Sequence, residues 1–226
     1  MRVTWDALLC RINGCMQCRL CAMRTNVVPG EGSGKSRIMF VGEGPGRDED
    51  LQGRPFVGAA GQLLDRMLDA IGLKREEVYI CNVVKCRPPN NRTPEESEAL
   101  SCLPFLREQF VLLQPKIIVC LGATAAKYLC DPEIRIARER GRLREKKGVW
   151  FLPTYHPAAL LRDPPKKKEA WEDLKTLREK YLELFRAGEI APEAVPNGWK
   201  ALLQVEGSQG KRAEREEKTQ NTDGKE

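Results

Sequence analysis

The chain has 226 residues, of which 41% are hydrophobic and 31% are charged, and its formal net charge is +6. This length suffices to bury the core of one domain, and no apolar run is long enough for a transmembrane helix. The first residues lack the basic start and apolar stretch of a secretion signal, so we expect a cytoplasmic protein that does not act on a membrane. In that reducing compartment the nine cysteines are expected to be thiols.

The distribution of charge suggests a domain, a tail and a polyanionic partner. We expect residues 1–203 to form one domain that acts as a monomer, and the charged tail 204–226 to be disordered. Positive charge is concentrated in residues 135–147, which carry seven basic and two acidic side chains. Such a focused charge favours nucleic acid as the partner. The alternative is a solvated basic hairpin, centred on Gly141.

Apolar periodicity predicts strands that alternate with helices. The strands are expected over 37–42, 78–84, 116–121 and 149–153, and the helices over 4–12, 57–71, 93–113, 123–129 and 171–184. Thr93, Pro94 and Glu96 suggest the start of the third helix, and Pro104 suggests a break within it. Alternation of this kind predicts an α/β protein whose parallel sheet is covered on both faces.

Ligands of such sheets bind beyond the carboxyl ends of the strands. The loops expected there span 42–50, 82–92, 122–124 and 154–162. His156, the single histidine of the chain, lies in the last of them, where an imidazole can donate to or polarise a substrate oxygen. Asn82 presents a donor beside an acceptor, which complements an imide edge. The structural alternatives are a satisfied histidine and a loop-capping asparagine.

The acidic first loop adds further candidates. Glu43 and Glu49 lie in it, and Phe56 follows shortly after. The phenyl ring is either part of the core or a plate on which a planar ligand stacks.

The cysteine spacing predicts a metal site without settling which residues form it. Cys15 and Cys18 form a C-x-x-C pair, and Cys86 and Cys102 supply a second pair, so zinc and an iron–sulfur cluster fit equally. Cys10 with the first pair imitates one ferredoxin spacing, and Cys21 with that pair imitates another. The remaining three cysteines, Cys81, Cys120 and Cys130, fall in strand or helix patterns and are expected to be buried small hydrophobes.

Four sequence blocks in order carry a resemblance to a known family. They read GEGPGRDED, GRPFVGAAGQLLD, NVVKCRPPNNRTP and TYHPAALLR. With them the chain resembles the family 4 uracil-DNA glycosylases, the iron–sulfur members of that superfamily. The resemblance implies a three-layer αβα sandwich on a central four-stranded parallel sheet. It also implies a four-iron four-sulfur cluster with a structural role, held by Cys15, Cys18, Cys86 and Cys102.

The same resemblance implies an activity and a site. The expected enzyme is a monofunctional glycosylase of base excision repair, which removes uracil from DNA and leaves an abasic site. Uracil would stack on Phe56, Asn82 would read its imide edge, and His156 would lie next to its O2. Glu43 would belong to the loop that positions the attacking water, and Glu49 is the second candidate for the carboxylate with this role. Gly44 occupies the place where some superfamily members have aspartate.

Contacts to DNA are expected from two segments. Leu160 and Leu161 could fill the gap that an extruded base leaves, and Arg162 could pin a phosphate. Three arginines of the basic run are expected to contact phosphates, namely Arg140, Arg142 and Arg144. A nucleic-acid-binding module stapled by zinc or iron–sulfur, without catalysis, is the main alternative function, and an iron–sulfur electron carrier is a second.

Overall fold

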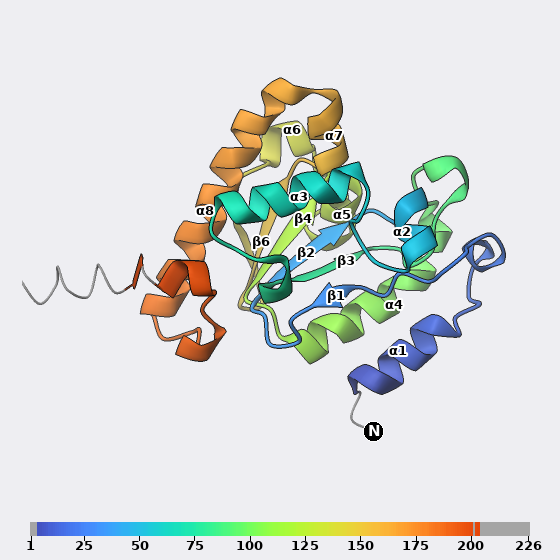
Figure 1. Ribbon diagram of the computed structural model, residues 1–226, viewed down its shortest axis with the longest axis horizontal. Coiled ribbons are helices and arrows are strands. Elements are labelled where there is room, and N and C mark those ends of the chain that lie inside the picture. Colours follow the sequence, from blue (N-terminus) through green and yellow to red (C-terminus); the bar gives the residue numbers. More distant parts are fainter. Residues whose placement is uncertain (1–3, 201, 204–226) are drawn as a thin grey trace, which may run out of the picture.

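A six-stranded sheet forms the centre of the computed structural model, in the order β1-β3-β2-β4-β6-β5 (Figure 1). The strands are β1 (Glu31–Gly32), β2 (Ile38–Gly42), β3 (Tyr79–Asn82), β4 (Ile117–Leu121), β5 (Arg144–Lys146) and β6 (Val149–Thr154). The inner strands β3, β2, β4 and β6 are parallel, as predicted. Two short antiparallel strands, β1 and β5, extend the sheet at its edges.

Helices cover both faces of this sheet, which confirms the three-layer αβα arrangement (Figure 1). One layer contains α3 (Ala59–Ala70) and α8 (Lys167–Arg186), and the other contains α1 (Trp5–Asn13), α4 (Glu96–Leu113) and α5 (Ala123–Leu129). The shorter elements are α2 (Arg47–Gln52), α6 (Ile136–Glu139), α7 (Pro157–Arg162) and the single 3-10 turns Arg19–Ala22, Arg75–Glu77, Pro89–Asn91, Pro164–Lys166 and Pro192–Ala194.

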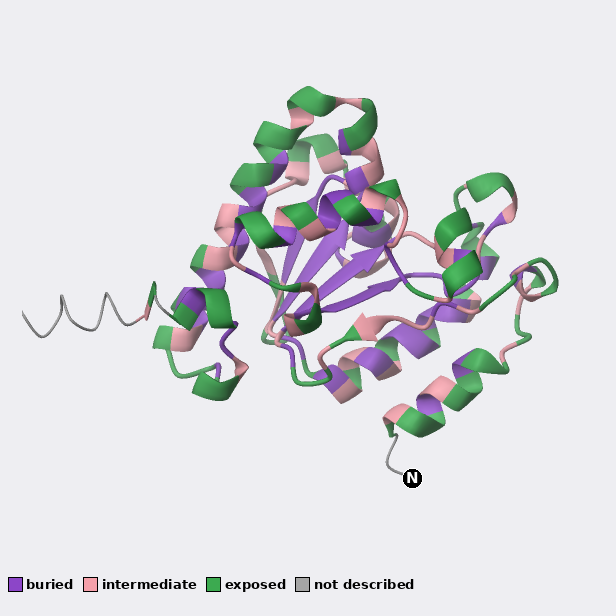
Figure 2. Cartoon of the chain, in the orientation of Figure 1, coloured by how far each residue is buried: buried purple, intermediate pink, exposed green. Residues whose placement is uncertain are grey.

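The core lies in two apolar layers because side chains alternate along each strand. In β2, Ile38 and Phe40 pack with the α3 and α8 layer, whereas Met39 and Val41 pack with the α1, α4 and α5 layer. All five residues of β2 are buried, as are all residues of its neighbours β3 and β4 (Figure 2). Continuous apolar runs are typical of parallel strands that are covered on both sides.

Helix α4 differs from its prediction at two points. Its N-cap is Glu95, whose backbone N–H donates to the Glu98 carboxylate at 2.8 Å, so the helix begins later than the Thr93 signal suggested. Pro104 does not break the helix, which continues to Leu113. A proline frees the carbonyl four residues earlier, and here that residue is the exposed Leu100, where water can satisfy the carbonyl.

The basic run forms a helix and a hairpin whose turn lies beyond the predicted centre at Gly141. Strand β5 pairs with β6 through Lys146 and Val149, so the chain reverses at Lys147 and Gly148. Both turn residues have positive φ, +53° and +75°, which is the conformation that a two-residue hairpin with the favoured twist requires. Gly148 therefore marks the turn better than Gly141 does.

The structure describes residues 4–200 and 202–203. In these ranges no helix combines the length and the apolar composition that crossing a membrane requires. The predicted tail 204–226 lies outside the described residues, so its separation from the domain stays a prediction.

Gly61, in the first turn of α3, allows the helix to pack on the loop before it. A Cβ at this position would lie 1.8 Å from the carbonyl oxygen of Phe56. We expect Gly61→Ala to lower the free energy of unfolding by about 3 kcal/mol, because the backbone must move to admit the methyl group. Gly14→Ala is the control, since its Cβ would meet its nearest atom at 3.6 Å. Equal stability losses in denaturant unfolding of the two variants would contradict this interpretation.

Candidate active site

A cleft of about 860 Å³ opens where the four parallel strands end. Each strand contributes to its lining: Glu43 follows β2, Asn82 ends β3, Thr124 follows β4 and His156 follows β6. All four loops expected at this edge take part. The volume is that of a small-molecule site, large enough for a nucleobase and its sugar.

Asn82 carries an unsatisfied acceptor into this cleft. Its side chain is 1% exposed, and its Oδ1 atom is buried without a hydrogen-bond partner among the described residues. A buried carbonyl oxygen without a donor costs about 1–3 kcal/mol. The loop-capping alternative would require this oxygen to bond to nearby backbone. Its free state instead suits an N–H group of a ligand.

Phe56 lies against Asn82 in a strained backbone conformation. Its φ is +52°, which is unusual for an aromatic residue, and its carbonyl accepts a hydrogen bond of 3.1 Å from Arg75 Nη1. A Cβ at Gly42 would lie 2.5 Å from both the Phe56 ring and Asn82 Oδ1. The missing side chain of Gly42 therefore lets the ring and the amide approach each other.

Glu49 is bound to the backbone of the loop that carries Phe56. Its carboxylate accepts from the N–H groups of Val57 and Gly58 at 2.9 Å each, and from that of Gly46 at 3.1 Å. These bonds join the start of α2 to the residues that follow the phenyl ring. Glu49 lines the cleft, but its oxygens are engaged in holding the loop.

The Glu43 carboxylate accepts fewer hydrogen bonds than the Glu49 carboxylate does. One of its carboxylate oxygens accepts a hydrogen bond from the hydroxyl of Thr124, and the second oxygen has no hydrogen-bond partner among those found in the described residues. The next residue, Gly44, leaves little room for a side chain, because a Cβ there would lie 2.7 Å from Val84 Cγ2. Thr124 was not identified from the sequence, since a threonine in the first turn of a helix carries no signal of this contact.

His156 is the N-cap of α7, and its ring is held in one tautomer. The Nδ1 atom accepts a hydrogen bond of 3.1 Å from the backbone N–H of Ala158, so the proton of the neutral ring is on Nε2. Burial lowers the pKa of His156 to about 4, and the charge of Arg162 adds to this effect against an opposing effect of Glu49. The ring lies 5.5 Å from that of Phe56, centroid to centroid. The cleft thus contains a neutral imidazole with one N–H donor.

The expected DNA contacts of α7 fit the structure in part. Arg162 lines the cleft. Leu160 is 1% exposed and packs in a small core with Leu63, Tyr155 and Ala170, so it is not available to fill a gap in DNA. Leu161 is 40% exposed and is the leucine of this pair that faces outward.

The three arginines of the basic run differ in their exposure. Arg140 bonds to Asp173, with Nε at 2.9 Å from the carboxylate, and Arg144 pairs with Glu139 at 2.7 Å. Arg142 is 71% exposed, with a long contact of 3.6 Å to Glu139. Internal ion pairs therefore occupy two of the three. Two arginines that the sequence did not single out also line the cleft: the exposed Arg47, and Arg92, which pairs with the buried Glu98 carboxylate at 2.7 Å.

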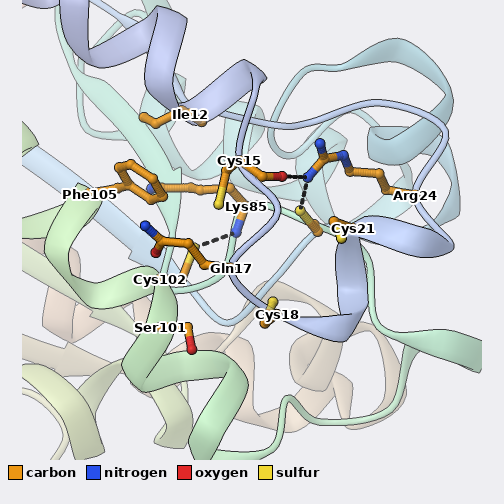
Figure 3. A pocket seen from close by; sticks show the side chains of 11 residues that line it. Ile12, Cys15, Gln17, Cys18, Cys21, Arg24, Lys85, Ser101, Cys102 and Phe105 are labelled. Atoms are coloured by element: carbon orange, nitrogen blue, oxygen red, sulfur yellow. Dashed lines mark hydrogen bonds between the residues drawn. The ribbon is translucent and has the colours of Figure 1, made fainter.

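A second, narrow pocket contains the cysteines of the predicted metal site (Figure 3). Cys15, Cys18, Cys86 and Cys102 all line it, and Cys21 lines it with them. Cys10 is exposed on α1 and is not part of the lining. Among the described residues, no three side chains of His, Cys, Asp or Glu are grouped so as to hold a metal ion. The structure thus brings the four predicted thiols together without excluding Cys21.

The thiols of this pocket receive hydrogen bonds from two basic residues. Arg24 donates from Nη1 to Cys86 Sγ at 3.2 Å, and the backbone N–H of Lys85 donates to Cys102 Sγ at 3.3 Å (Figure 3). Burial raises the pKa of Cys86, and it raises that of Cys102 to about 11. Donors aimed at sulfur are typical of sites whose cysteines become ligands.

The other cysteines behave as predicted. Cys81, Cys120 and Cys130 are buried in the core layer on the α4 side of the sheet. Cys120 and Cys130 lie with their sulfur atoms 3.5 Å apart.

Comparisons with known proteins agree on one family. The family model described as the uracil DNA glycosylase superfamily matches residues 29–175. A type-4 uracil-DNA glycosylase from Sulfurisphaera tokodaii is 49% identical over 174 residues, which are 73% of this chain and 79% of the relative. One from Archaeoglobus fulgidus is 48% identical over 77% of this chain and 92% of the relative. One from Thermotoga maritima is 51% identical over 68% and 81% respectively.

The single histidine makes the state of the cleft measurable by NMR. We expect the His156 ring to titrate near pH 4 in the folded protein, against 6.5 in the unfolded chain. Because the unfolded chain takes up the proton first, stability should fall as the pH drops from about 6.5 towards 4. His156→Gln should lack this part of the pH dependence. A midpoint near 6.5 in the folded protein would contradict the proposed burial of a neutral ring.

Proposed function

The chain belongs to the uracil-DNA glycosylase superfamily and to its type-4 group, and we propose that it hydrolyses the N-glycosidic bond of uracil in DNA. The product is an abasic site for base excision repair. Hydrolysis needs water and no external cofactor. The described residues that line the cleft include no lysine to act as an amine nucleophile, which supports a monofunctional activity. The observation that carries the proposal is the buried, unpartnered Oδ1 of Asn82 at the end of β3.

Asn82 is proposed to read the imide edge of uracil. Its free Oδ1 would accept the N3–H of the base, and its Nδ2 would donate to the neighbouring carbonyl O4. Cytosine lacks the N3–H and carries an amino group in place of O4, so both contacts would be mismatched in a dry pocket. The Phe56 ring beside this amide offers a face on which the extruded base can stack.

His156 is proposed to stabilise the departing uracil. As the bond to the sugar breaks, negative charge develops on the base, including its O2 atom. A neutral imidazole with its proton on Nε2 can donate to O2, and its held orientation avoids the cost of reorganisation. The low pKa of His156 supports this role, because the ring stays in one state at neutral pH.

Glu43 is proposed to position the attacking water. The sugar gains positive charge in the transition state, so a carboxylate beneath it serves both the cation and the water. The Thr124 hydroxyl holds one oxygen of Glu43, which leaves the second for water. The reserve candidate, Glu49, is less suited because three backbone N–H groups occupy its carboxylate.

Uracil-containing DNA is the proposed partner, bound by a monomer whose cleft is formed within one chain. Arg47 and Arg162 line the cleft and are suited to phosphates close to the extruded base. Of the basic run, Arg142 offers an exposed cation for DNA farther away. A cytoplasmic location is in keeping with nine free cysteines.

We further propose that Cys15, Cys18, Cys86 and Cys102 hold a four-iron four-sulfur cluster. The donor set fits, because four thiols line one pocket and N–H donors point at two of the sulfurs. When bound, the cluster would supply structural cross-links and no chemistry of the hydrolysis. It would tie the turn after α1 to the loop after β3 and to α4.

The alternative function is a nucleic-acid-binding module that is cross-linked by zinc or an iron–sulfur cluster and has no catalytic activity. It would account for the thiol pocket and the basic surface. It gives no reason for an unsatisfied asparagine, a strained phenylalanine and a neutral histidine to line one cleft.

Asn82→Ala is expected to reduce uracil excision by about a hundredfold or more, because two base-specific hydrogen bonds are lost. Its free energy of unfolding should not fall by more than about 1 kcal/mol, since Asn82 Oδ1 has no hydrogen-bond partner in the described part of the chain. Single-turnover assays on an oligonucleotide with one uracil would measure the first effect, and denaturant unfolding the second. Asn13→Ala is the control, because Asn13 ends α1 and does not line the cleft. Full excision by Asn82→Ala would support the capping alternative.

The purified protein is expected to be brown and to contain about four irons per chain. Cys86→Ala and Cys102→Ala should lose the iron and unfold more readily, whereas Cys10→Ala should keep the iron content of the parent. Cys21→Ala decides between the two ligand sets, because Cys21 lines the same pocket. If Cys21→Ala loses iron while Cys102→Ala keeps it, the proposed ligand set is wrong.

A further inference from the structure

Lys85 is a buried lysine without a carboxylate partner in the part of the chain that the structure describes. Its side chain is 2% exposed, and its Nζ atom donates to Asn82 O at 2.8 Å and to Gln109 Oε1 at 2.7 Å. Both acceptors are neutral. Gln109 is itself fixed, since its Nε2 donates to Pro29 O at 2.8 Å and to the Tyr79 hydroxyl at 3.0 Å. An ammonium in such surroundings is costly unless negative charge lies nearby.

The thiol pocket is the place from which that negative charge can come. Lys85 lines the pocket, and its backbone N–H is joined to Cys102 Sγ in Figure 3. Lys85 also contacts the Cys81 thiol, but burial raises the pKa of Cys81 and keeps it neutral.

Arg24 is a second cation of this pocket for which no carboxylate partner is found among the described residues. Its Nη1 donates to Cys15 O at 2.8 Å and to Cys86 Sγ at 3.2 Å, and its Nη2 donates to Asn13 O at 3.5 Å. Four thiolates around a four-iron four-sulfur core with two positive charges leave two negative charges. The two cations, Arg24 and Lys85, match that charge.

The ammonium of Lys85 also donates to the backbone of Asn82, the residue that is proposed to recognise uracil. Its bond to Asn82 O closes the turn after β3. The same turn is bonded to the end of β2 and the loop that follows it. Val83 N donates to Gly42 O at 2.9 Å, and Val84 N donates to Glu43 O at 3.2 Å. Holding the Asn82 carbonyl fixes the backbone from which the Asn82 amide projects into the cleft.

We propose that Lys85 is a positioning residue that joins the thiol pocket to the uracil site. Its charge balances the anionic group that the cysteines hold, and its hydrogen bond orients Asn82. Loading of the pocket and recognition of uracil are therefore coupled through one side chain. This inference rests on the proposed function, including the iron–sulfur ligand set.

Lys85→Met tests both parts of the role, because methionine keeps the length and removes the charge and the donor. Iron release to a chelator should become about tenfold faster or more, as for other partners of metal ligands. The midpoint potential of the cluster should shift to more negative values, since a neighbouring positive charge favours the reduced form. The Kd for free uracil, the probe of the Asn82 pocket, should rise by about tenfold or more.

Lys180→Met is the matched control. Lys180 is also a buried lysine, at 8% exposure, but it has a carboxylate partner in Glu183 at 2.6 Å and lies over the Trp150 ring. It lines neither the thiol pocket nor the cleft. Its iron release and uracil Kd should stay within about twofold of the parent values.

Lys85→Arg separates the charge from the hydrogen bond and serves if Lys85→Met fails to fold. The guanidinium keeps the charge but cannot reproduce the compact ammonium between its two acceptors. Iron release should stay near the parent rate, and the uracil Kd should still rise. Iron release as fast as in Lys85→Met would overturn the charge role, and an unchanged uracil Kd would overturn the positioning role.

The parent protein distinguishes this inference from the function on which it rests. A parent that does not excise uracil would overturn the proposed function. A parent that excises uracil but contains no iron would overturn the cluster and the charge role of Lys85. A folded Lys85→Met with parental iron release, potential and uracil Kd would overturn the inference alone.

Discussion

The turn after β3, from Asn82 to Cys86, is the constraint on which both the cleft and the thiol pocket depend. Its backbone bonds to Gly42 and Glu43 on the neighbouring loop, and Lys85 O accepts from Val28 N at 2.8 Å. One end of the turn presents the Asn82 amide to the cleft, and the other presents Cys86 to the thiol pocket. Five residues thus join the cleft to the thiol pocket. A shift of this turn would disturb both.

The cleft concentrates features that reduce stability. Asn82 has an unsatisfied oxygen, Phe56 has a positive φ, and the ring of His156 is kept neutral by burial. Each costs free energy, and such costs persist when the surrounding structure holds them. Here Glu49 and Arg75 supply that support by bonding to the backbone on either side of the phenyl ring. These bonds thus hold the strained loop in one position at the edge of the cleft.

Two arginines of the basic run, Arg140 and Arg144, are engaged in ion pairs within the fold, although composition alone suggests a nucleic-acid surface. Arg140 joins the hairpin region to α8 through Asp173, which also accepts from the Thr154 hydroxyl at 2.6 Å. Positive charge near the cleft comes instead from arginines elsewhere in the sequence, such as Arg47 and Arg162. Net charge therefore indicates the class of partner, whereas the ion pairs decide which cations can meet it.

The local sequence determined the strands, the helices and the edge of the sheet where the site lies. Apolar periodicity decides which residues are buried, so β4 and α5 were predicted to within one residue, and the loops that carry Asn82 and His156 followed. Only the tertiary structure decided the partners of individual side chains. It bonded Glu49 to three backbone amides, buried Leu160 and paired Arg140 with Asp173. It also placed the Lys85 ammonium between Asn82 O and Gln109 Oε1. Partners such as Arg140 and Asp173 lie tens of residues apart in the sequence. Local periodicity shows which side of an element faces the core, but it does not show which distant group a side chain contacts there.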